Sequence, residues 1–184
     1  MALTFNLETV TNLYKKLERD ARALDEKVTS DRLFNFVVTG YSLIDWIKND
    51  PSIAAAAKND TKCLYEDRWL KVCGDLATAG KHFKIDQRPP ITSNTSSSTG
   101  FGMGRYGKGV YGIGEESIEI KLNDGSSFQC DELVRGDRIL LSDAVYAVGR
   151  LVLDGRVPPH VVVDHRVRRR EIESRPAGLQ TDEE

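Results

Sequence analysis

The stretch from Arg68 to Phe83, RWLKVCGDLATAGKHF, constrains the fold of this chain more than any other segment. Arg68, Asp75 and His82 recur at intervals of seven residues and form a polar stripe, which lies about 100° round the helix from an apolar one. The apolar stripe is typical of an amphipathic helix packed against its neighbours and consists of Trp69, Val72, Leu76 and Phe83. We therefore expect a buried helix with polar side chains at the rim of a groove between helices.

Two earlier segments also have the apolar spacing of helices. Asn6 or Thr9 can cap the first of them, and Thr29 or Ser30 can cap the second. The second helix is expected to end before Pro51, because proline disfavours a helical conformation at the residue that precedes it. The third long helix is expected to run from about residue 62 to residue 83 and to contain the stretch from Arg68 to Phe83.

Asp45 is the one polar member of an apolar stripe on the second helix, where it follows Phe34, Val38 and Tyr41. A carboxylate inside a protein core requires a partner, because burying an unpaired charge is very unfavourable. We expect Asp45 to be buried and to bond a neighbouring helix.

The helical pattern stops in the middle of the chain, where residues 86–116 are first rich in serine and threonine and then in glycine. Gly102, Gly104 and Gly107 match the GxGxxG spacing of phosphate-binding loops. That motif binds a nucleotide only between a strand and a helix, whereas here it follows a Ser/Thr-rich stretch and precedes a strand. We expect this segment to be a linker and a flexible or self-packed loop, and we expect no cofactor.

A β-hairpin is predicted next, because Ile118, Ile120 and Leu122 alternate with polar residues and the sequence Asn123-Asp124-Gly125 favours a turn. A two-stranded hairpin alone is marginally stable in water, so it must pack on the helices or gain a third strand. The only candidate for that strand is residues 160–164, HVVVD. A last helix is expected to begin between residues 131 and 137 and to end near residue 155.

The predicted fold is thus α+β and mainly α: a bundle of four main helices with an appended β-hairpin. Residues 1–85 form the first three helices, 86–116 the linker and loop, 117–155 the hairpin and final helix, and 156–184 a partly disordered tail. The net charge of −2 argues against a nucleic-acid-binding surface spread over the whole molecule. A local basic patch remains open.

Cysteine usage and the N-terminus bear on the compartment. Cys63, Cys73 and Cys130 are odd in number and form no CxxC pair, so neither a disulfide framework nor a zinc site is indicated. The N-terminus does not have the pattern of a signal peptide, and the longest apolar run, residues 139–153, is too short and too polar to span a bilayer. We expect a cytoplasmic protein with reduced thiols, no metal and no membrane association.

LFNFVVTGYSLIDWIKNDP and RWLKVCGDLATAGKHF together resemble uncharacterised proteins of bacteria and their phages, in which a helix ending in DW and a helix ending in KH recur. Four helices with a histidine late in the third also resemble the HEPN superfamily. The resemblance covers residues 1–85 and the last helix. It implies a helical bundle and, for many members, a dimeric metal-independent ribonuclease of a toxin or phage-defence system.

The HEPN ribonuclease pattern is an arginine, four to six residues, and then a histidine. His82 matches the histidine, but positions 75–77, where the arginine is expected, hold Asp, Leu and Ala. The resemblance would make His82 a base in proton transfer, with Lys81 and Arg68 against a phosphate and Asp75 orienting a neighbour. A histidine beside lysine at a helix end is equally suited to interact with the last carbonyls of the helix.

Because no complete catalytic constellation accompanies the well-patterned core, we expect a non-catalytic binding or interaction protein of bacterial or phage origin. Its partner would be another protein or a second copy of the chain. The alternative is a divergent HEPN-type ribonuclease or toxin that acts on RNA. A third possibility is that the Gly-rich loop docks onto a partner and becomes ordered there.

Overall fold

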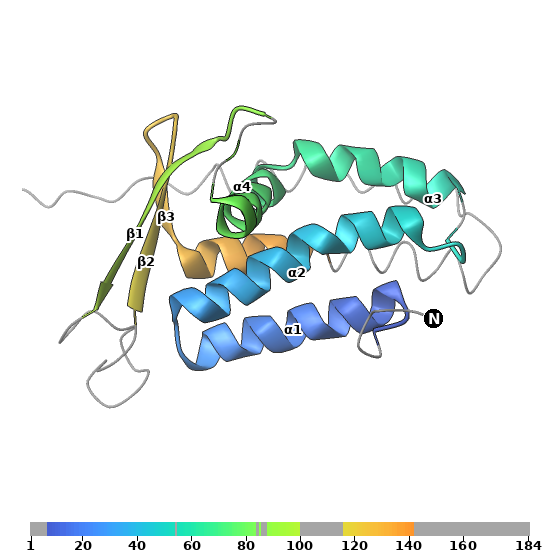
Figure 1. The fold of residues 1–184 in the computed structure, drawn as a ribbon, viewed down its shortest axis with the longest axis horizontal. Coiled ribbons are helices and arrows are strands. Elements are labelled where there is room, and N and C mark those ends of the chain that lie inside the picture. The colour runs from blue at the N-terminus through green and yellow to red at the C-terminus, as the bar shows by residue number, and fades with distance from the viewer. Residues whose placement is uncertain (1–6, 54, 84, 86–87, 100–115, 142–184) are drawn as a thin grey trace, which may run out of the picture.

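The computed structural model describes residues 7–53, 55–83, 85, 88–99 and 116–141. The mainly helical α+β fold is confirmed: helices α1 to α4 and a further helix over residues 130–141 accompany a three-stranded antiparallel sheet. Figure 1 shows the sheet at one end of the helices, so that the strands close the bundle rather than extend it.

The first two helices lie antiparallel and side by side (Figure 1). Helix α1 spans Val10–Glu26 and α2 spans Ser30–Asn49, and they are capped by Thr9 and Thr29, whose hydroxyls accept from backbone N–H groups three residues on. The expected starts of both helices are confirmed, and so is the expected end of α2 before Pro51. The apolar stripe of α1 is fully buried and consists of Val10, Leu13, Leu17, Ala21 and Leu24.

The third long helix begins later than its apolar period predicts. Residues Thr61–Glu66 form a 3₁₀ helix, η1, which follows the short helix α3 (Ala55–Asp60), and α4 spans Arg68–His82. Helix α4 begins at Arg68 because Asp67 accepts hydrogen bonds from the N–H groups of Trp69 and Leu70 at 2.8 and 3.4 Å.

The buried face of α4 is also rotated from the predicted one. Val72 is buried as expected, but the core side chains beside it are Leu70, Cys73 and Ala77. Trp69 and Leu76 are only partly buried. The prediction for Phe83 is wrong: it is fully exposed, because the helix ends at His82 and Phe83 adopts the left-handed conformation of a C-cap (φ 63°).

The sheet corrects the linker prediction. Residues Thr92–Thr99, which the sequence assigned to a linker, form strand β1, paired antiparallel along its length with β2 (Glu116–Leu122). The expected hairpin joins β2 to β3 (Ser127–Gln129), through a turn in which Gly125 has a φ of 84°. The strand order is β1-β2-β3. Strand β1 is therefore the additional strand that the β2–β3 hairpin gains.

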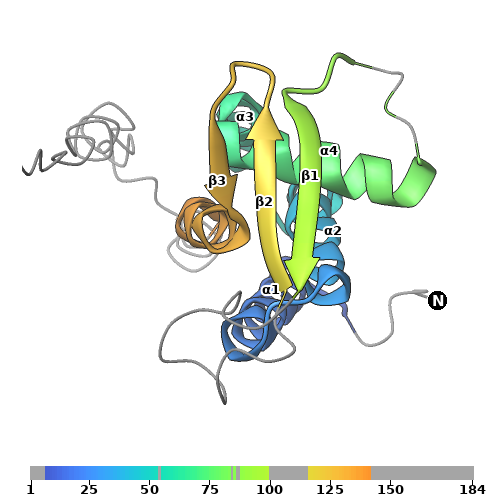
Figure 2. The same cartoon turned by 90° about the vertical axis from the view of Figure 1, so that its left-hand side faces the viewer.

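The sheet is bound to the helices by one apolar face (Figure 2). Ile118, Ile120 and Leu122 of β2 point into the core, together with Phe128 of β3. The ring of Phe128 meets Trp69 of α4 edge to face, with the centroids 5.1 Å apart. The hairpin therefore shares its core with the bundle.

The last described helix follows β3 directly, at residue 130, and continues to residue 141. Leu133, Val134 and Leu141 bury its inner face against the bundle, as expected of the final helix. Its predicted end near residue 155 lies outside the described residues, as do Gly102, Gly104 and Gly107, the candidate strand 160–164 and the tail 156–184. Within the described part of the chain, none of the helices is long and apolar enough to cross a bilayer.

Candidate functional site

The structure does not bring Arg68 and His82 together. They are the first and last residues of α4, 14 positions apart, which corresponds to about 21 Å along a helix axis at 1.5 Å per residue. Arg68 donates to Ser126 Oγ at 2.7 Å, and its guanidinium lies 6.0 Å from the centre of the Phe128 ring. His82 and Lys81 are exposed at the other end.

Asp75, the middle residue of the polar stripe formed by Arg68, Asp75 and His82, is buried, with 1% of its surface exposed. Its Oδ1 is paired with Arg88 at 2.6 Å, and its Oδ2 accepts from the backbone N–H groups of Ile91 and Thr92 at 2.8 and 2.9 Å. The carboxylate thus bonds the segment that leads into β1. Asp75 has a structural partner set and lies apart from both His82 and Arg68.

The prediction that Asp45 is buried is wrong. Asp45 is exposed, and its Oδ1 accepts from the hydroxyl of Tyr65 at 3.3 Å. Lys48 donates to the same hydroxyl at 2.8 Å and lies 4.1 Å from the centre of the ring. The core face of α2 is the opposite edge of its apolar surface, where Phe36, Leu43 and Ile44 are fully buried.

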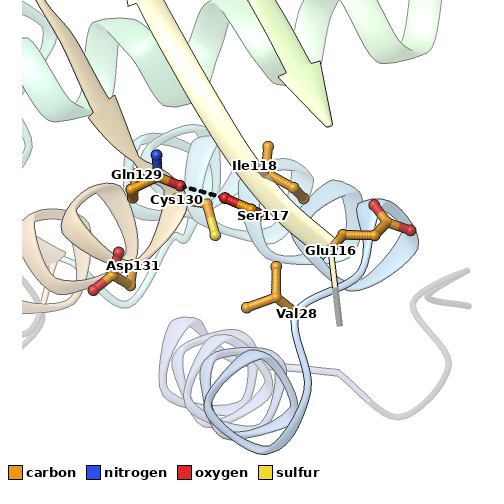
Figure 3. A pocket seen from close by; sticks show the side chains of 7 residues that line it. All are labelled: Val28, Glu116, Ser117, Ile118, Gln129, Cys130 and Asp131. Carbon is orange, nitrogen blue, oxygen red and sulfur yellow. Dashed lines mark hydrogen bonds between the residues drawn. The ribbon is translucent and has the colours of Figure 1, made fainter. Parts of the chain in front are cut away.

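A small pocket lies where the start of β2 meets the connection between α1 and α2 (Figure 3). The carboxylate of Glu116 accepts from the N–H of Ser30, at 2.9 Å, and from its hydroxyl, at the first turn of α2. Ser117 donates to Gln129 at 3.1 Å. The cavity volume is about 70 Å³, whereas small-molecule sites commonly hold roughly 300 Å³ or more. Glu116 therefore joins β2 to α2, and Ser117 joins β2 to β3.

A second buried carboxylate was missed by the sequence analysis. Asp137 is completely buried in the helix over residues 130–141, and neither of its oxygens has a hydrogen-bond partner of good geometry. Burial raises the pKa of Asp137 to about 7, the nearby thiol of Cys73 lowers it, and the charge of Asp67 raises it. The pKa of Cys73 is in turn raised, mainly by burial. Apolar spacing alone gave no signal that an acid occupies the core here.

The most open feature of the described residues is the outer edge of β1. This strand is an end strand of the sheet, and seven of its eight residues are exposed. Its sequence, TSNTSSST, contains no charge and no proline. The sequence offered one signal for this strand, since threonine favours strands and no glycine or proline interrupts the eight residues.

Among the described residues, no group of three or more His, Cys, Asp or Glu side chains is arranged to hold a metal ion. No family model matches the chain, and no curated protein or solved structure is significantly similar to it. The resemblance to HEPN proteins stays a prediction from the sequence.

Proposed function

We propose that this protein is a non-catalytic binding module that takes up an extended polypeptide segment along the free edge of β1. Binding by strand addition uses the main-chain N–H and C=O groups of an edge strand for affinity and its side chains for specificity. The observation that carries the proposal is the exposure of β1, an uncharged end strand of eight residues.

Exposed edge strands are normally protected against pairing with other chains. The common protections are a very short strand, a lysine or other charge, a proline, or a bulge that bends the edge away. Strand β1 has eight residues, no charge and no proline, and its one irregularity of register lies at its start, between Thr92 and Asn94. An unprotected edge of this length is suited to a partner strand.

The edge is also held in place before any partner arrives. Asp75 bonds the backbone at Ile91 and Thr92, and Asn123 donates from its side chain to the carbonyl of Pro90 at 2.7 Å. Residues Asn94 to Thr99 then pair in continuous register with β2. Because β1 is already ordered, the entropic cost of binding falls mainly on the incoming segment.

The side chains of β1 indicate the chemistry of the partner. Serine and threonine hydroxyls both donate and accept hydrogen bonds, so they match an uncharged polar strand. The strand offers neither lysine nor arginine to a phosphate backbone, which favours a polypeptide over RNA.

The ribonuclease alternative predicts a dimer that brings two His82 side chains to one basic cleft, where Lys81 and Arg68 assist His82 and Asp75 orients a neighbour. Arg68 and His82 occupy opposite ends of α4, and the carboxylate of Asp75 bonds Arg88 and the backbone before β1. No observation favours catalysis by these four residues in one chain. Cleavage of RNA by the purified protein, abolished in His82→Ala, would favour the ribonuclease over our proposal.

Two neighbouring proline substitutions test strand addition. In an antiparallel strand, the N–H groups of successive residues point to opposite sides. One of Thr95→Pro and Ser96→Pro therefore removes an N–H at the free edge, while the other removes an N–H that bonds β2. The first should keep the melting temperature of the wild type, and the second should lower it.

The binding probe is a displayed library of ten-residue cysteine-free peptides that includes the β1 sequence, selected on dilute wild-type protein. Affinities of enriched peptides are then measured by fluorescence anisotropy. We expect the stable proline variant to bind them at least about tenfold more weakly, as loss of edge hydrogen bonds predicts. Equal binding by both proteins, or no peptide enriched on the wild type over the stable variant, would overturn the proposal.

A further inference from the structure

We propose that the segment which completes the edge of β1 is β1 of a second copy of this chain, paired antiparallel about a two-fold axis. This inference rests on the proposed function, because it names the partner for the same edge. Two copies would form one continuous six-stranded sheet in the order β3-β2-β1-β1-β2-β3.

Self-pairing through β1 determines which edges of the sheet stay exposed. Among the described residues of one chain, the sheet ends in β1, with eight residues, on one side and in β3, with three residues, on the other. Pairing through β1 covers both long edges and leaves only the two short β3 strands at the outside. Short outer strands are one of the ways in which natural sheets avoid further association, so the assembly closes as a dimer.

Strand β1 is complementary to itself. A two-fold axis perpendicular to the sheet places each side chain of β1 opposite one on the same face of the other copy. Those side chains are serine and threonine on both faces, with Asn94 on one of them, and all of them can donate and accept. Every register therefore juxtaposes hydrogen-bonding groups, and Ser/Thr pairs across strands are favourable.

The charged residues of the sheet do not oppose self-pairing of β1. Glu119 and Lys121 on β2 pair with Ser96 and Asn94, so the nearest charges in the sheet stand one strand behind the edge. In the dimer the two β2 strands would be three strand spacings apart, about 14 Å. That exceeds the Debye length of about 8 Å at physiological ionic strength, so like charges of the two copies would scarcely repel.

The two-fold symmetry limits the register in which the two β1 strands can pair. Side chains that face each other across the axis must lie on the same face, so the residue on the axis pairs with its own copy. The regular part of β1 runs from Asn94 to Thr99, because the irregularity precedes Asn94. The longest symmetric ladders in that range are centred on Ser96 or Ser97.

Sedimentation equilibrium of the full chain provides the first test. We expect the average mass to rise from monomer towards dimer over about a hundredfold range of concentration, and no further. Ser96→Lys places two ammonium groups near the axis and should raise the dissociation constant of the dimer by at least about tenfold. The matched control is Ser127→Lys, an exposed serine on β3 at the opposite edge, which should dimerise like the wild type.

A cysteine scan tests the register. Single cysteines are placed at residues 94–98 in a Cys63→Ser background, since Cys73 and Cys130 are buried. Directly opposed residues in antiparallel strands are close enough for a disulfide. We expect oxidative cross-linking to peak at Ser96→Cys or Ser97→Cys, at least about fivefold above the adjacent positions.

The outcomes separate this inference from the proposed function. A monomer at every concentration that still binds displayed peptides along β1 would reject self-pairing and leave strand addition standing. A monomer that binds no such peptide would reject both. A dimer that Ser96→Lys leaves intact, or cross-linking that is uniform along the scan, would place the interface elsewhere and reject the inference.

Discussion

At the scale of single residues, Asp75 and Asp137 are both buried carboxylates whose surroundings differ sharply. Asp75 accepts from two backbone N–H groups and forms an ion pair with Arg88. Asp137 is completely buried beside the thiol of Cys73, and neither of its oxygens has a hydrogen-bond partner of good geometry. Asp75 thus holds the start of β1 in place, whereas Asp137 lowers the stability of the fold when it is ionised.

Asp75→Ala should lower the free energy of unfolding by about 3 kcal/mol, because it leaves two partly buried N–H groups without their acceptor and removes the ion pair with Arg88. Arg88→Ala should cost only about 1 kcal/mol, since the Arg88 side chain is 38% exposed and its ion pair is partly screened by water. Urea unfolding measures both values. Equal costs for the two variants would show that the carboxylate does not anchor β1 through the backbone.

Asp137→Asn should change stability in a pH-dependent way. The pKa of Asp137 rises from 3.8 to about 7 on folding, so below about pH 4 both states of the wild type bind this proton. Between pH 4 and 7 the unfolded chain loses the proton while the folded protein keeps it, so the wild type loses stability as pH rises. A pKa shift of this size corresponds to a loss of roughly 4 kcal/mol in the free energy of unfolding, and the full loss is reached above pH 7.

The asparagine variant should therefore match the wild type at pH 4 and be more stable by up to about 4 kcal/mol at pH 8. The measurement is the difference in unfolding free energy between variant and wild type at each pH. Asp131→Asn, a half-exposed position on the same helix, provides the control and should show no such dependence. A difference that is the same at both pH values would contradict the account of Asp137.

Residue-level predictions from the sequence succeeded where the cause is local. The caps Thr9 and Thr29 act on N–H groups three residues away, and periodicity locates them. The burial of Asp45 could not be predicted in this way. Which edge of the broad apolar face of α2 enters the core depends on how α4 lies against it, and that is a tertiary property.

At the scale of elements, α2 and α4 meet through aromatic rings laid on glycines. A Cβ added at Gly74 would lie 2.6 Å from the ring of Tyr41, and one added at Gly80 would lie 2.6 Å from the ring of Phe34. The close neighbours of both glycines are therefore side chains of α2.

The two glycines should respond differently to alanine. Each substitution gains about 1 kcal/mol in helix propensity. Phe34 is 42% exposed and can swing outward, so Gly80→Ala should be neutral or stabilising. Tyr41 is held between the helices, so Gly74→Ala should destabilise by about 1 to 2 kcal/mol. Thermal unfolding compares the pair, and a stabilised Gly74→Ala would show that the contact is loose.

The elements themselves were predicted with uneven success. Helices α1 and α2 and the β2–β3 hairpin follow from periodicity and turn residues, which are local signals. Strand β1 was missed because TSNTSSST has no apolar alternation. Its conformation is fixed by pairing with β2, between residues 17 to 30 positions apart in the sequence, and by the buried carboxylate of Asp75.

At the scale of the whole molecule, the sheet closes one end of the helices and turns β1 outward (Figure 2). The apolar face of β2 shares a core with α4, while β1 adds hardly any buried surface. Ordering eight residues that bury little is unfavourable for an isolated chain. A partner strand on the free edge would supply a second ladder of hydrogen bonds and offset that cost.

Residue-resolved hydrogen exchange of β1 tests this central claim most directly. Alternate N–H groups between Asn94 and Thr99 bond β2 and should be protected at every protein concentration. The intervening ones point to the free edge, and we predict that they exchange freely in dilute protein and become protected at high concentration or with an enriched peptide. Free exchange of this second set under all these conditions would contradict the claim that the edge of β1 binds an extended strand.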